Sequence, residues 1–239
     1  MEFGQPLIPA RLLRRYKRFL ADVELADGSH LTVHCPNTGA MLGCDHPGAR
    51  VWLSRSDNPR RRYPHTWEMV EVEPRRIVGI NTARTNRLIE EALVSGVIGE
   101  LAGFVTLRRE VRLSEYRTRI DFRLEYAGPD PDCYLEVKNV TAAVSDRVAL
   151  FPDAVSARAV RHLEVLTELV GQGQGAALCY CAQRSDVDLV RPAVEIDPAY
   201  ADALARARAA GVRVLAYGCR VEPDRIAVER KIDVQADVV

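Results

Sequence analysis

Three residues in the middle of the chain, Asp121, Glu136 and Lys138, have types and spacing that could do chemistry together. Glu136 and Lys138 lie two apart in the apolar run Cys133–Val140, so on a strand their side chains share one face. Asp121 lies between two apolar residues on the preceding predicted strand, and hairpin pairing would bring it alongside Glu136. Two carboxylates and a lysine are costly to bury unless a cation compensates them.

This cluster predicts a site for a divalent cation, because Mg²⁺ prefers carboxylate oxygens and water. Mg²⁺ is the expected metal and Mn²⁺ the alternative. Asp121 and Glu136 would bind the ion, and Lys138 would orient an attacking water or hold a phosphate oxygen. The competing interpretation is a structural ion pair at a sheet edge, in which Lys138 pairs with Glu136 or Asp121.

The segments that must position this cluster alternate between strand and helix patterns. Strands are predicted over residues 117–126, 133–140, 176–182 and 212–217, with a turn at 127–132 and helices over 81–98, 153–170 and 198–210. Asp153 is the expected N-cap of the second helix, and Glu91 on the first helix is a candidate further metal ligand. A solvated helix face is the alternative for Glu91. Strand–helix alternation predicts an α/β sheet with right-handed crossovers.

The first third of the chain has a different pattern, with short strands separated by turn residues. Five strands within about 80 residues favour a small barrel of the OB type. The predicted fold class is therefore α/β (α+β overall), with an OB-like barrel at residues 1–80 and an α/β domain at residues 81–239.

Basic residues gather at three places beside aromatic ones, a mixture typical of nucleic-acid contacts. The candidates are Arg15, Lys17 and Arg18 in the first strand, Arg60, Arg61, Arg62, Tyr63, His65 and Trp67 in a loop, and Arg158 and His162 on a helix. The alternatives are a solvated strand start, a loop kept for solubility, and an ordinary helix flank. The predicted partner is DNA, with RNA as the alternative.

Composition limits these interpretations. Lys plus Arg and Asp plus Glu both number 33, so a nucleic-acid surface has to be a local patch. Neither a signal peptide nor a membrane span is visible, and the six cysteines fit buried thiols in the cytoplasm, so no membrane partner is expected. The sequence shows no Ser-His-Asp signature, zinc spacing or P-loop. It leaves the oligomeric state open, a dimer included.

The order of Asp121, Glu136 and Lys138 resembles the motif of the PD-(D/E)xK nuclease superfamily. Over nearly its full length the chain also resembles the sugar fermentation stimulation protein A family. The matching stretches are RYKRFLADV at 15–23, HCPNTGAM at 34–41, SDNPRRRYPHTWE at 56–68, NT at 81–82, EA at 91–92, RIDF at 119–122, EVKNVT at 136–141 and FPDAV at 151–155, with Arg158 and His162 as the following R-x-x-x-H.

This resemblance implies an N-terminal OB-like domain, a C-terminal nuclease-like domain, and DNA binding linked to the regulation of sugar (maltose) metabolism. It implies DNA binding more firmly than cleavage. Three hypotheses follow: a Mg²⁺-dependent phosphodiesterase, a non-catalytic DNA-binding regulator that keeps a nuclease fold as scaffold, and an α/β domain for small molecules or proteins.

Overall fold

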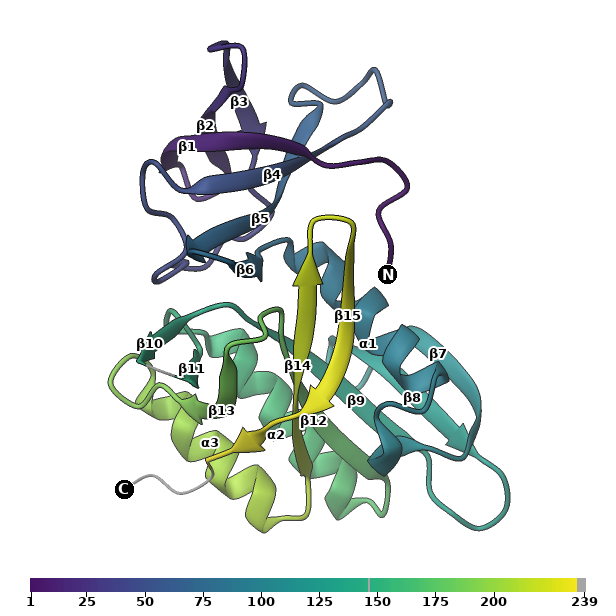
Figure 1. Cartoon of the computed structure of the whole chain (residues 1–239). Helices are drawn as coiled ribbons and strands as arrows, with labels where there is room; N and C mark the ends of the chain where they lie inside the picture. The colour runs from purple at the N-terminus through teal and green to yellow at the C-terminus, as the bar shows by residue number, and fades with distance from the viewer. Residues whose placement is uncertain (146, 236–239) are drawn as a thin grey trace.

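A computed structural model describes residues 1–145 and 147–235, and it shows a β-barrel joined to a mixed sheet flanked by helices (Figure 1). The barrel strands are β1 (Ile8–Tyr16), β2 (Leu20–Leu25), β3 (His30–His34), β4 (Arg50–Arg55) and β5 (His65–Glu73), followed by β6 (Arg76–Gly79). β1 pairs antiparallel with β2 and β4, and a parallel bridge between β3 and β5 closes the barrel. The predicted OB-like barrel is thus confirmed.

Alternating side chains fill this barrel. Leu12, Val23, Val33 and Leu53 are fully buried there, as period-2 patterning requires. Trp67 is also fully buried, and its indole nitrogen donates to the Met69 carbonyl at 2.8 Å. The predicted nucleic-acid contact of Trp67 is therefore wrong, because a base cannot stack on a ring that forms the barrel core.

After β6 the chain continues with Asn81, whose side chain caps the 3₁₀ turn η1 (Thr82–Arg84) by accepting from the Ala83 N–H. The elements that follow are α1 (Thr85–Val94), the 3₁₀ turn η2 (Gly99–Leu101), β7 (Phe104–Leu113), β8 (Thr118–Tyr126), β9 (Cys133–Val140), β10 (Ala143–Ser145), β11 (Arg147–Phe151), α2 (Ala157–Gly171), β12 (Gly175–Ala182), β13 (Val187–Pro192), α3 (Pro198–Ala209), β14 (Arg213–Glu222), β15 (Arg225–Lys231) and β16 (Asp233–Val234).

The main sheet has the strand order β15-β14-β12-β9-β8-β7. The three central strands β9, β12 and β14 are parallel, as the predicted strand–helix alternation requires. Both faces of this sheet are covered. Helix α1 packs on one face, with Leu88 and Ile89 fully buried, and α2 and α3 pack on the other, with Leu163 and Leu204 fully buried (Figure 1). β9, which carries Glu136 and Lys138, therefore lies between two hydrophobic cores.

A second sheet, β10-β11-β13-β16, was not predicted by the sequence pattern. Its strands are short, and two of them lie in the connection between β9 and α2. The cap of α2 also differs from the prediction, since the Ser156 hydroxyl accepts from the Ala159 N–H at 3.2 Å. Asp153 instead accepts a hydrogen bond from the Met41 N–H of the barrel domain at 3.1 Å.

One barrel loop, the segment after β3, makes polar contacts with the second domain. The Thr82 hydroxyl donates to the Pro36 carbonyl at 2.8 Å, and the Asn37 amide lies 3.4 Å from the Thr141 hydroxyl. Gly39 lies so close to Asp153 that a Cβ atom would meet the carboxylate at 2.3 Å, so this approach requires glycine. The barrel loop after β3 is thereby held against the loop before α2.

The first residues of the chain pack on the second domain, although the prediction placed them with the barrel. Glu2 forms a bridge with Arg225, and the Met1 side chain is buried in the core beneath α1. Figure 1 shows this segment descending from β1 to the hairpin of β14 and β15.

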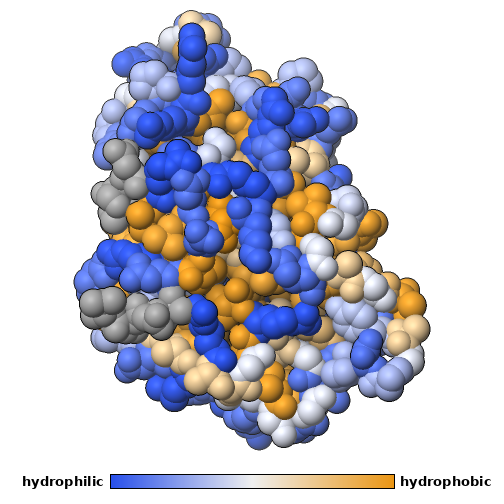
Figure 2. Space-filling model, turned by 60° about the horizontal axis from the view of Figure 1, so that its bottom comes forward, coloured by the Kyte–Doolittle hydropathy of each residue, from blue (hydrophilic) through white to orange (hydrophobic). Residues whose placement is uncertain are grey.

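On the face shown in Figure 2, hydrophilic side chains are interspersed with apolar ones. Within the described residues, no helix is long and apolar enough to cross a membrane.

Candidate active site

Glu136 and Lys138 lie side by side on β9, as their spacing predicts. The Lys138 ammonium donates to Glu136 Oε1 at 2.6 Å. Both side chains are almost withdrawn from solvent, with 4% of Glu136 and 12% of Lys138 exposed. The ion pair that the sequence analysis gave as an alternative is thus present. The remaining contacts of Glu136 show whether both of its carboxylate oxygens have partners.

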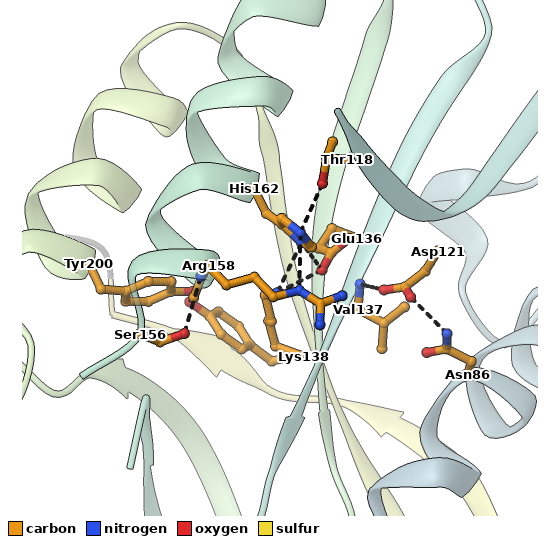
Figure 3. A network of polar contacts seen from close by, with 12 residues as sticks. Asn86, Thr118, Asp121, Glu136, Val137, Lys138, Ser156, Arg158, His162 and Tyr200 are labelled. Atoms are coloured by element: carbon orange, nitrogen blue, oxygen red, sulfur yellow. Dashed lines mark hydrogen bonds and ion pairs between the residues drawn. The ribbon is translucent and has the colours of Figure 1, made fainter. Parts of the chain in front are cut away.

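His162 of α2 is the second partner of Glu136. Its ring nitrogen Nδ1 contacts Glu136 Oε1, and its Nε2 lies 3.3 Å from the Thr118 hydroxyl (Figure 3). The imidazole is 3% exposed. The predicted nucleic-acid contact of His162 is therefore wrong, because the ring faces Glu136 inside the protein instead of solvent.

The two contacts of Glu136 fall on one oxygen only. Oε1 receives both His162 and Lys138, whereas the buried Oε2 has no hydrogen-bond partner within the described chain. Burial raises the pKa of Glu136, but the His162 hydrogen bond and the Lys138 charge outweigh it, so the net pKa lies below the ordinary value. A deprotonated carboxylate with one orphaned oxygen is costly to bury, and a cation at Oε2 would relieve that cost.

Asp121 directly precedes Phe122, the first β8 residue that pairs with β9, opposite Leu135, and it is close enough to Glu136 for the two charges to interact. Its Oδ2 accepts from the Val137 N–H and its Oδ1 from the Asn86 side chain, each at 2.8 Å (Figure 3). Burial and the nearby Glu136 charge raise the pKa of Asp121 to about 6. The paired carboxylates thus repel each other in the absence of a cation.

The predicted set of three carboxylates does not form. Glu91 accepts from the Met1 α-ammonium at 2.6 Å and from Arg87 at 3.0 Å. Among residues 1–145 and 147–235, no three His, Cys, Asp or Glu side chains are placed to hold one metal ion. The α1 residue that contacts Asp121 is Asn86, which the sequence interpretation missed.

Asp121 and Glu136 nevertheless fit a magnesium ion, because Mg²⁺ is often held by one or two carboxylates, with waters and substrate phosphates as its other ligands. The orphaned Glu136 Oε2 and the mutual repulsion of the pair are the observations that support this fit.

A cleft of about 430 Å³ adjoins Lys138 at the junction of the two domains. Lys138 and the exposed Arg158 line it from the second domain, and Arg18 and Thr38 line it from the barrel domain. The Arg158 guanidinium lies 3.5 Å from His162 Nε2 and is positioned over Lys138 (Figure 3). Two of the predicted basic residues, Arg18 in the turn after β1 and Arg158 on α2, thus line one cleft.

Arg15 and Arg18 hold the barrel loop. Arg15 donates to the Asn37 carbonyl at 3.0 Å and the Gly39 carbonyl at 2.7 Å, and Arg18 donates to the Thr38 carbonyl at 2.9 Å. Arg15 is only 10% exposed, so it is a structural support of the cleft wall. Lys17 is exposed at the adjoining turn.

The predicted basic loop connects β4 and β5 of the barrel, whereas Asp121, Glu136 and Lys138 lie on strands of the second domain. Arg60 and Arg62 are exposed, and the Arg62 guanidinium covers the Tyr63 ring at 5.4 Å. The Arg61 side chain instead turns inward and donates to the Thr66 hydroxyl at 3.0 Å. The pKa of His65 is lowered by burial and by the charge of Arg55.

The architecture defines a two-domain protein in which an OB barrel is joined to an α/β domain built on a mixed sheet flanked by helices. Family models match as the SfsA N-terminal OB domain over residues 13–80 and the sugar fermentation stimulation protein RE domain over residues 83–225. The chain therefore belongs to the sugar fermentation stimulation protein family.

Relatives along the whole chain agree. The sugar fermentation stimulation protein homolog of Thioalkalivibrio sulfidiphilus (strain HL-EbGR7) is 58% identical over 98% of each chain. That of Pseudomonas fluorescens (strain SBW25) is 53% identical over 99% of this chain and 100% of the relative. The solved structure of Pyrococcus furiosus SfsA in complex with Ca²⁺ is 25% identical, covers 98% of each chain and has a TM-score of 0.87.

Proposed function

We propose that this protein binds nucleic acid and cleaves its phosphodiester bonds with Mg²⁺ or Mn²⁺ held by Asp121 and Glu136. The observation that carries the proposal is the orphaned Glu136 Oε2 in a buried cluster of two carboxylates and a lysine. The similar Pyrococcus furiosus protein, whose structure is described as a complex with Ca²⁺, supports a divalent-cation site. DNA is the proposed substrate, with RNA as the alternative.

The bound ion would supply Lewis-acid stabilisation of charge on the phosphate. The chain's own residues would do the positioning. Lys138 would hold a phosphate oxygen or orient the attacking water, because its ammonium lies at the cleft wall. His162 would fix the Glu136 carboxylate by holding Oε1, which leaves Oε2 directed elsewhere. Arg158 would contact the phosphate backbone at the cleft entrance.

The setting we propose is the cytoplasm, because all six cysteines are free and buried. A link to the regulation of sugar (maltose) metabolism is proposed from family membership.

Cleavage of labelled single- and double-stranded DNA and RNA, with Mg²⁺, Mn²⁺ or EDTA, tests the proposal. Wild type and Lys138→Ala are purified in parallel, so that a contaminating nuclease appears equally in both. Metal-dependent cleavage that is lost in the variant would establish the enzyme and its substrate. Cleavage that persists unchanged in Lys138→Ala would reject this site.

A second candidate function is a DNA-binding regulator in which the nuclease fold serves only as a scaffold. It is favoured by the missing third acidic ligand, since Glu91 is engaged with the Met1 ammonium. Binding that weakens with salt, without cleavage by either protein, would support it.

A further inference from the structure

A second cavity, of about 580 Å³, lies at the end of the barrel that faces α1. Its floor is formed by the adjacent ends of three barrel strands, with His34 on β3, Arg55 on β4 and Thr66 on β5. The chain segment before β1 and the first residues of the second domain form its walls. This cavity has a different lining from the cleft beside Lys138, so it is a separate feature of the molecule.

The charges that line this cavity are not balanced. Buried Glu68 is fully used, since Arg84 reaches both of its oxygens, at 3.1 and 2.7 Å, and Ser54 and Asn81 also donate to it. Arg87 is paired with Glu91. Arg55 and Arg61 also line the cavity, and neither forms an ion pair with an acid of the described chain, while Glu2 is an exposed carboxylate of the lining.

Uncharged donors lie beside these guanidinium groups. Arg61 donates to the Thr66 hydroxyl at 3.0 Å, so the proton of that hydroxyl is available to another acceptor. His34 Nδ1 is buried without a hydrogen-bond partner among the described residues. Burial and the charge of Arg61 lower the pKa of His34, which favours the uncharged imidazole. The cavity thus combines unpaired positive charge with an unsatisfied ring nitrogen.

We propose that this cavity binds the phosphate group of a ligand of nucleotide size, through Arg55, Arg61, Thr66 and His34. Guanidinium groups match phosphate oxygens with paired hydrogen bonds, and two of them fit a doubly charged phosphate monoester. The volume lies within the range of about 300–1,000 Å³ that is usual for small-molecule sites, well above the need of a phosphate ion alone. Phe3 supplies an aromatic wall, with the Arg84 guanidinium 5.2 Å from its ring centroid.

Two sources could supply this phosphate group, a free nucleotide or one nucleotide of a bound strand. The proposal does not depend on cleavage at Asp121, Glu136 and Lys138. The test is calorimetric titration of the full chain in EDTA. The four ligands, titrated separately, are adenosine 5′-monophosphate, adenosine, inorganic phosphate and a deoxythymidine strand of ten nucleotides. EDTA removes any metal-dependent binding at the other site.

We expect adenosine 5′-monophosphate to bind and adenosine not to bind. Arg55→Gln and Arg61→Gln should each weaken binding about tenfold, since each removes a charge-assisted contact to phosphate. For adenosine 5′-monophosphate, Arg60→Gln is the matched control, because Arg60 belongs to the same loop as Arg61 but does not line the cavity. Lys138→Ala should bind adenosine 5′-monophosphate with the affinity of the wild type. Arg55 is exposed, so its variant keeps the test valid if Arg61→Gln fails to fold.

The outcomes separate the two sources. If only the strand binds, and Arg55→Gln and Arg61→Gln weaken it more than Arg60→Gln does, the phosphate belongs to nucleic acid. The proposal is overturned if adenosine binds as tightly as its monophosphate, or if neither the monophosphate nor the strand binds. It is also overturned if Arg55→Gln, Arg61→Gln and Arg60→Gln all change the affinity equally. Loss of cleavage in Lys138→Ala with unchanged nucleotide binding would support each site independently.

Discussion

Within the described residues, the cluster on β8 and β9 has unpaired negative charge, whereas the cavity at the barrel end has unpaired positive charge. In the cluster, the buried Glu136 carboxylate has one oxygen without a partner among the described residues, and burial and the Glu136 charge raise the pKa of neighbouring Asp121. In the cavity, Arg55 and Arg61 form no ion pair with an acid of the described part of the chain, and His34 Nδ1 has no hydrogen-bond partner there. The first therefore calls for a cation and the second for an anion. A protein that needed these groups only for stability would pair them internally.

The largest expected effect comes from Glu136→Gln, which removes the charge that holds the metal but keeps the side-chain shape. We expect Mn²⁺ binding, measured by electron paramagnetic resonance, to be lost and cleavage to fall by about 100-fold or more. Binding of adenosine 5′-monophosphate at the barrel end should not change. Mn²⁺ affinity equal to that of the wild type would remove Glu136 from the metal site.

Asp121→Asn should affect stability in a direction that depends on metal. Because the pKa of Asp121 is raised from 3.8 to about 6, the folded protein keeps a proton that the unfolded chain has lost between these values. The free energy of unfolding therefore falls as pH rises through this window. In EDTA at pH 8 the variant should be more stable than the wild type by at most about 3 kcal/mol, and equal to it below pH 3.8.

Denaturant unfolding at several pH values measures this difference. Saturating Mg²⁺ should stabilise the wild type more than Asp121→Asn, because only the wild type retains both carboxylates. A variant that is less stable in EDTA at pH 8 would contradict the repulsion between Asp121 and Glu136.

His162→Asn tests whether the histidine positions Glu136. Without the ring, Glu136 Oε1 retains only Lys138, so we expect Mn²⁺ affinity to weaken about tenfold. Thr118→Val, which removes only the hydroxyl 3.3 Å from His162 Nε2, is the milder comparison and should have a smaller effect. If His162→Asn lowers thermal stability but leaves Mn²⁺ affinity unchanged, the histidine is a packing residue.

The smallest effect is expected from the exposed cations of the barrel loop. Arg60→Gln and Arg62→Gln should each reduce the salt dependence of single-strand binding, lowering the slope of log affinity against log salt by about 0.7. Fluorescence anisotropy with a labelled strand at several salt concentrations measures it. Unchanged slopes in both variants would show that this loop does not contact the strand.

The sequence predicted the elements that local patterning controls. Alternation predicted short strands in the barrel and the strands β8 and β9, because a side-chain period of two fixes which residues of a strand share a face. The same alternation placed Glu136 and Lys138 together, and hairpin pairing placed Asp121 beside them. The short strands of the second sheet escaped prediction, since β10 has three residues and β16 two.

Partners that are distant in the sequence could not be predicted from local pattern. The spacing of Arg158 and His162 placed both on one helix, but only the packing of α2 against β9 turned His162 toward Glu136. Glu91 and Asn86 lie on the same helix, but Glu91 pairs with the Met1 ammonium whereas Asn86 contacts Asp121. Trp67 looked like a stacking platform beside three arginines, yet strand alternation turned it into the barrel core.

The sequence by itself determined the family, the two-domain order, and the strand that carries a carboxylate and a lysine on one face, because these follow from short-range spacing. The tertiary structure alone decided which charges remain unpaired. Among residues 1–145 and 147–235, Glu136 Oε2 and His34 Nδ1 have no hydrogen-bond partner and Arg55 and Arg61 have no acidic partner, because their surroundings are built from segments far apart in the chain. Whether a charged group has a partner depends on its neighbours in space, and the pattern of residues along the sequence does not specify them.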